Sequence, residues 1–194
     1  MKRFAIALII ALMIPACIFA GRGLFDLTLG VAASTTYDIE KAKEGEIKNI
    51  TLDDFKFGAD AEVKLAFVSV DGKLFYDQAN KGISGLVSAN IAADIFFVRV
   101  KAGLGYQYTY NFDTKTFSLG NEAGIVNDFA NFKDACFDVN AGVDFLIGPV
   151  TVGAYATLPT ETSIANGQWG ELFKALAEKW NLAQLGLTVG FALL

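Results

Sequence analysis

The chain has 194 residues, of which 53% are hydrophobic and 19% are charged, with a formal net charge of −5 at neutral pH. An acidic chain is unsuited to nucleic acid, which proteins bind through basic surfaces. Histidine, a CxxC pair and a glycine-rich phosphate loop are all missing, so the sequence gives no support to a metal site, a cofactor or nucleophilic catalysis. We therefore predict no metal, no cofactor and no enzymatic activity.

The start of the chain has the pattern of an export signal. Lys2 and Arg3 precede the apolar run Phe4–Ile14, which is too short to be a convincing membrane span. We expect residues 1–20 to be a secretory signal peptide that is cleaved off. The residues before Cys17 loosely resemble a bacterial lipobox, so lipidation of this cysteine is the alternative to simple cleavage.

Apolar residues alternate with polar or small ones throughout the segment from Phe55 to Phe67. This period of two is typical of a β-strand with one apolar and one polar face. The same alternation predicts strands at residues 25–34, 87–92, 98–110, 137–145, 150–158 and 185–193. We assign a weaker eighth strand to residues 46–52, because single-chain bacterial barrels normally have an even number of strands.

The segments between the predicted strands fall into short and long connections. We expect tight turns, on the periplasmic side, at residues 53–54, 93–95 and 148–149. We expect longer outer connections near residues 37–45, 71–82, 113–133 and 159–181. Short turns on one side and long loops on the other are the asymmetry of outer-membrane barrels.

The two faces of the predicted strands differ in a way that favours a membrane. The strands are about ten residues long, as a tilted membrane strand requires, and the face opposite the apolar one is rich in Gly, Thr, Asn and charge. We predict an all-β fold for residues 21–194: a closed antiparallel eight-stranded transmembrane up-and-down barrel, with a short amphipathic helix in the last outer loop. A soluble barrel is the alternative, and its apolar rows would point inward.

Aromatic residues near the ends of the outward-facing rows predict interfacial girdles. We place Phe55, Phe57, Phe96, Phe145 and Phe191 near the periplasmic ends of the strands. We place near the outer ends Phe67, Tyr106, Tyr108, Tyr110 and Phe137.

Over essentially the whole mature chain, this arrangement resembles the small eight-stranded outer-membrane barrels of the OmpX, OmpA and OmpW type. The resemblance is one of architecture. The last strand, apolar at every second position from Leu185 to Leu193, is similar to the terminal signal read by the barrel-assembly machinery, although that signal usually ends on Phe or Trp and here Leu194 is last. The resemblance implies a place in the bacterial outer membrane, with membrane lipid and the assembly machinery as partners.

An eight-stranded barrel is just wide enough for side chains to fill it, so we do not expect a wide pore. Arg99 and Lys101 start one strand at the depth where Asp144 ends the next, and we expect ion pairs there that plug the lower lumen. The alternative is a charged constriction that passes ions. The residues predicted to form lumen ion pairs are Lys56, Asp60, Glu62, Lys64, Arg99, Lys101, Asp138 and Asp144.

The segment from Gln168 to Asn181 has apolar residues at helical spacing and charged residues on the other face, which predicts an amphipathic helix. Such a helix could cover the barrel mouth, rest on the outer leaflet or guide an apolar ligand. Trp169, Phe173 and Trp180 would then make the mouth or ligand contact.

We therefore predict a structural or surface-interaction protein of the adhesion type, whose outer loops meet an extracellular partner. Two alternatives within the membrane are a conduit for small hydrophobic molecules and a narrow ion channel. A soluble periplasmic lipid-binding barrel is a further alternative.

Overall fold

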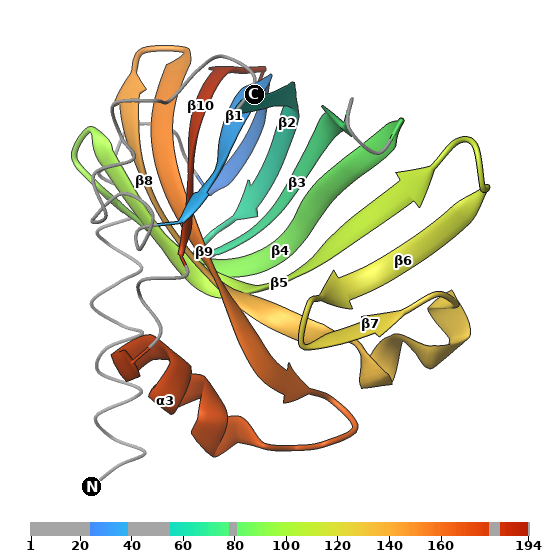
Figure 1. Cartoon of the computed structure of the whole chain (residues 1–194). Helices are drawn as coiled ribbons and strands as arrows, with labels where there is room; N and C mark the ends of the chain where they lie inside the picture. Colours follow the sequence, from blue (N-terminus) through green and yellow to red (C-terminus); the bar gives the residue numbers. More distant parts are fainter. Residues whose placement is uncertain (1–23, 39–54, 78–80, 179–182, 194) are drawn as a thin grey trace, which may run out of the picture.

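The computed structural model describes residues 24–38, 55–77, 81–178 and 183–193 (Figure 1). The signal peptide expected at 1–20 and the strand expected at 46–52 lie outside these residues. The strands are β1 (Phe25–Asp38), β2 (Phe55–Leu65), β3 (Val68–Asp77), β4 (Gly82–Ile95), β5 (Val98–Asn111), β6 (Thr116–Asn121), β7 (Gly124–Val126), β8 (Cys136–Ile147), β9 (Val150–Ser163) and β10 (Gln184–Ala192). The helices are the 3₁₀ helix η3 (Phe129–Asp134) and the α-helix α3 (Trp169–Glu178).

Eight of the strands close into an antiparallel barrel in the order β1-β2-β3-β4-β5-β8-β9-β10, and β10 pairs with β1 to complete the ring. This confirms the predicted closed eight-stranded antiparallel barrel. The hairpin β6–β7 continues the sheet from β5 outside the ring, as the yellow strands of Figure 1 show.

One strand of the ring comes from a segment that was predicted to be a loop. The sequence interpretation put a long outer connection at residues 71–82, whereas β3 occupies Val68–Asp77 and pairs with both β2 and β4. Its residues alternate as in the other strands, but the dipeptide Asp71–Gly72 is typical of turns and hid the pattern. Strand pairing on both sides overrides this local preference.

The barrel has two unlike ends. At the turn end lie the two-residue turns Ala66–Phe67, Phe96–Phe97 and Gly148–Pro149, together with the start of β1 and the end of β10. The predicted turn at 148–149 is confirmed, whereas the one at 93–95 is wrong because these residues belong to β4. At the opposite, loop end lie the end of β1, the start of β2, the end of β3, the start of β4 and the residues 112–135 between β5 and β8.

Because β3 follows β2, β2 runs in the direction opposite to the one predicted. Phe55 pairs with Thr35 at the loop end, and Leu65 pairs with Phe25 at the turn end. Phe55 and Phe57 therefore lie at the loop end and Phe67 at the turn end, which reverses their predicted positions. The other predicted girdle residues lie at the expected ends: Phe96, Phe145 and Phe191 at the turn end, and Tyr106, Tyr108, Tyr110 and Phe137 at the loop end.

The barrel is polar inside and apolar outside. Val31 and Leu187 on the outer face are 62% and 61% exposed, whereas the side chain of Arg99 inside is 0% exposed. All of the largest fully buried side chains are polar or charged: Arg99, Lys64, Thr160, Thr162, Asp26, Asp71, Asp94, Asp138, Ser69 and Ser88. Among the described helices, none is long and apolar enough to cross a membrane.

Candidate functional site

Charged side chains from β1, β2, β3, β4, β5 and β8 meet inside the barrel in one connected set of ion pairs. The alternation of each strand turns its polar positions inward, and the register of neighbouring strands brings these positions to similar depths. We call this set the ion network. Its members are Asp26, Asp60, Glu62, Lys64, Asp71, Lys73, Asp94, Arg99, Lys101 and Asp144.

Arg99 is the centre of the network at the turn end. Its guanidinium donates through Nε to Asp94 Oδ1 at 2.7 Å, through Nη1 to Glu62 Oε1 at 2.9 Å and through Nη2 to Asp26 Oδ2 at 2.6 Å. Each bond is charge-assisted, and the planar fork of Arg suits several carboxylates at once. The guanidinium has no exposed surface, so it is fully enclosed by its partners and the barrel wall.

Lys101 extends the network one layer toward the loop end. Its Nζ lies 2.7 Å from Glu62 Oε2, 2.9 Å from Asp144 Oδ2 and 3.4 Å from Asp71 Oδ2. Lys73 Nζ then lies 3.2 Å from Asp60 Oδ1 and 3.7 Å from Asp71 Oδ1. Charges removed from water are stable only when they are paired and hydrogen-bonded, so these contacts hold the lumen-facing side chains in place.

Several predicted lumen residues are brought together and others are not. Lys101 lies against Asp144 as expected, whereas Arg99 contacts the acids of β1, β2 and β4. Lys56 pairs with Asp77 at 2.7 Å near the loop end, outside the ion network. The sequence interpretation missed Asp71, Lys73, Asp77 and Asp94, which it had assigned to a loop and a turn.

Asp138 takes no part in the ion network formed by the described residues, contrary to the prediction. Its carboxylate accepts hydrogen bonds from Asn121 Nδ2 at 2.8 Å and from Gln107 Nε2 at 2.7 Å. Beside it β5 and β8 part, since their pairing ends at Gly105 and Asp138. From this point β6 takes the place of β8 beside β5.

Asn121, the last residue of β6, bridges the gap where β5 and β8 part. Besides its bond to Asp138, the same amide nitrogen donates to Phe137 O at 3.2 Å and to Thr160 O at 3.0 Å. The hairpin β6–β7 is thus fastened to β8 and β9 by one buried side chain. Sequence alternation gives no signal for such a bridge.

An amide and hydroxyl layer lies next to the ion network. Asn140 donates to Asn90 Oδ1 at 2.7 Å and to Ser88 Oγ at 3.0 Å, and Asn90 donates to Asp71 Oδ2 at 2.8 Å. These bonds link the uncharged part of the lumen to the charged part. From the turn end up to this layer, the lumen is therefore filled by side chains that bind one another.

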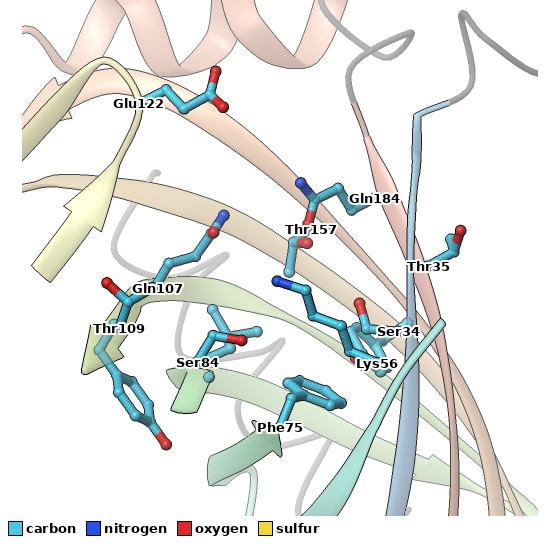
Figure 2. Close-up of a pocket in the computed structure, with 14 residues that line it drawn as sticks. Ser34, Thr35, Lys56, Phe75, Ser84, Gln107, Thr109, Glu122, Thr157 and Gln184 are labelled. Atoms are coloured by element: carbon cyan, nitrogen blue, oxygen red, sulfur yellow. The ribbon is translucent and has the colours of Figure 1, made fainter. Parts of the chain in front are cut away.

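Beyond this layer the lumen opens into a cavity of about 350 Å³ at the loop end, which we call the cup (Figure 2). The large aromatic and apolar residues that line it are Phe75, Leu86 and Tyr155, which are buried, and Tyr108, which is half-buried. Figure 2 shows Lys56, Gln107 and Gln184 pointing into the space above Phe75. The polar residues of the wall include Ser34, Thr35, Ser84, Thr109, Thr157 and Glu122.

Comparison of the chain with protein-family models, with curated proteins and with solved structures finds no match. The fold and the lumen therefore carry the functional argument. Within the described ranges, no group of three or more Cys, Asp or Glu side chains is arranged to hold a metal ion.

The predicted mouth residues are placed only in part. The Trp169 ring, at the start of α3, lies with its centroid 5.6 Å from that of the Phe137 ring. The Phe137 ring also meets the Tyr106 ring edge-on, with 6.2 Å between the two centroids. Phe137 was predicted to lie in an outward-facing row, but these rings cover it and it is buried. The side chain of Phe173 and the whole of Trp180 lie outside the described part of the chain.

Proposed function

We propose that the protein is an integral β-barrel of the bacterial outer membrane, of the same architectural type as the OmpX, OmpA and OmpW barrels. The observation that carries the proposal is the inverted arrangement of the barrel, with a charged interior and an apolar exterior. Soluble proteins rarely expose large continuous apolar surfaces, whereas a barrel in lipid needs one.

The outer rows support this proposal strand by strand. Exposed apolar residues occur on every strand of the ring, so the apolar surface surrounds the barrel and does not form a single patch. Each of the eight ring strands also pairs with a ring neighbour on both sides, as a hydrocarbon environment requires. The soluble lipid-binding alternative needs the apolar rows to face inward, and they face outward.

The filled lumen favours a structural or surface-interaction role over a diffusion pore. Arg99 and Lys64 have no exposed surface, so side chains pack closely in the lumen at the turn end. In this proposal the loop-end connections meet an extracellular partner, while membrane lipid and the barrel-assembly machinery are the partners of the barrel itself. The signal peptide at residues 1–20 provides the export route.

The experiment that tests the proposal is refolding of the protein in detergent micelles, followed by gel electrophoresis of boiled and unboiled samples. A shift in migration on boiling, with strand-rich circular dichroism, is expected. Stable folding in buffer without micelles would contradict a membrane barrel.

The narrow ion channel remains the second candidate, because charged side chains line the lumen throughout the ion network. We expect little conductance from the wild-type protein in a planar lipid bilayer. The double variant Glu62→Ala with Arg99→Ala removes the central side chains of the network and should raise the conductance. Steady ion currents through the wild-type protein would favour a channel.

A further inference from the structure

The cup differs from the rest of the lumen because its lining side chains leave an open space between them. Its volume of about 350 Å³ falls in the range of roughly 300–1,000 Å³ that is usual for small-molecule sites. The side chains of the lower lumen satisfy one another, whereas those of the cup wall surround a space. A site of this size suits a ligand no larger than a disaccharide.

The floor of the cup combines apolar surface with charge below it. Phe75 and Tyr155 pack together with Ala32 in the only apolar cluster that the described residues form inside the ring. Lys73 of the ion network lies 4.7 Å from the centroid of the Tyr155 ring, which anchors this ring from the network side. The floor therefore offers a fixed aromatic surface in a lumen that is otherwise polar.

The wall of the cup is made of groups that both donate and accept hydrogen bonds. Hydroxyls such as Ser84 and Thr157 and amides such as Gln184 have this double capacity. Ligand hydroxyls require the same combination, because each of them donates one hydrogen bond and accepts others. An anionic ligand would instead require unpaired cations.

The charges of the cup do not favour an ionic ligand. The cation of the wall, Lys56, is held by Asp77 at 2.7 Å, so this pair is close to neutral. Glu122 is exposed and lies in the turn between β6 and β7. The cup thus has an aromatic floor, a wall of hydroxyls and amides, and a lysine whose charge is paired. These features suit a neutral ligand with one apolar face and several hydroxyls.

We propose that the cup binds a neutral carbohydrate unit, of monosaccharide or disaccharide size, with the C–H face of the sugar ring against Tyr155 and Phe75. The hydroxyls of the sugar would bond to Gln184, Ser84 and Thr157. This inference uses the barrel lumen alone and goes beyond the proposed membrane role.

The test uses the full chain folded in an alkyl amine-oxide detergent, because alkyl glycoside detergents carry a sugar that would compete for the cup. Glucose, maltose and glucuronate are the probes, followed by saturation-transfer NMR and calorimetric titration. We expect saturation transfer to the ring protons of glucose or maltose. Glucuronate, which adds a carboxylate to the same ring, should bind several-fold more weakly.

Two conservative variants locate the binding. Gln184→Leu and Ser84→Ala each remove a group that is proposed to bond a sugar hydroxyl, and each should weaken binding about 2- to 10-fold, the range expected for one hydrogen bond. Thr188→Val is the matched control, since Thr188 faces the lumen from the same strand as Gln184 but does not line the cup. It should leave the affinity unchanged.

Three results would overturn the inference: no saturation transfer to either neutral sugar at tens of millimolar, equal binding of glucuronate and glucose, or equal affinity in all three variants. The shift in gel migration on boiling does not depend on the cup. A protein that shows the shift and binds no sugar would therefore refute the carbohydrate site and leave the barrel proposal standing.

Discussion

Arg99 and Asp94 face each other across the β4–β5 hairpin and form a two-point contact, with Nε 2.7 Å from Oδ1 and Nη2 3.1 Å from Oδ2. The two-residue turn Phe96–Phe97 fixes this register, because it leaves Asp94 directly opposite Arg99. The centre of the ion network is therefore set by the shortest kind of connection in the fold. Substitutions that break this ion pair should therefore destabilise the whole ion network.

Replacing Arg99 by Ala should destabilise the folded protein by about 3–5 kcal/mol, because the carboxylates of Asp26, Glu62 and Asp94 would stay buried without their common cation. The midpoint of urea unfolding in micelles measures this loss. The control is Lys81→Ala, which removes an exposed ion pair to Asp113 and should change stability by less than about 1 kcal/mol. Equal losses in the two variants would show that the network does not stabilise the barrel.

Gly186→Ala should destabilise the barrel by about 1–3 kcal/mol, because a Cβ at this inward position would collide with the ring of Tyr155. Gly170→Ala is the matched change in α3, where an added Cβ meets nothing within 4 Å. Its better helix propensity should leave stability unchanged or raise it by up to about 1 kcal/mol. Thermal unfolding of both variants separates the two effects, and an unaltered Gly186→Ala protein would contradict the packing described for Tyr155.

Val189→Arg tests whether the outer face contacts lipid. Val189 faces outward between Val31 of β1 and Val152 of β9, near the middle of these strands. An arginine at the bilayer midplane should cost about 2–4 kcal/mol in lipid vesicles. Thr114→Arg, in the exposed turn at residues 112–115, should cost little. Equal, small effects at both positions would show that the outer face is in contact with water.

Asn121→Ala should loosen the β6–β7 hairpin, because it removes the amide that holds the hairpin to β8 and β9. Losing these buried bonds costs about 1–3 kcal/mol, which raises local amide hydrogen exchange in β6 and β7 roughly 5- to 150-fold. Asn127→Ala is the control, since Asn127 accepts one exposed bond from Ser118 at 2.9 Å. Exchange that stays slow in the Asn121 variant would mean that the strand pairing alone holds the hairpin.

Much of the ring could be predicted from the sequence, because the period of two survives in strands that have one polar and one apolar side. The strand β3 was not predicted. Its dipeptide Asp71–Gly72 has a local preference for turns, whereas the pairing that overrides this preference comes from two neighbouring strands. One misplaced strand reversed β2, and the positions of Phe55 and Phe57 changed with it.

The ion network could be predicted only in part. Alternation identifies which residues face the lumen, but it does not give partners from strands that are not neighbours. Arg99 and Asp26 lie 73 residues apart in sequence, on β5 and β1, and meet across the lumen. Such a contact depends on the barrel diameter and on the lengths of the two side chains, and the sequence of one strand does not give the barrel diameter. The cup could not be predicted either, because the position of a cavity depends on how far the side chains of several strands reach into the lumen.

The pairing of β1 with β10 joins the first and last strands of the ring through partners such as Leu29 and Phe191. A chain that stops before β10 would leave two open edges, one on β1 and one on β9, each ready to pair with another molecule. The ring can therefore close only after β10 has been made. A variant that lacks β10 is for this reason expected to aggregate.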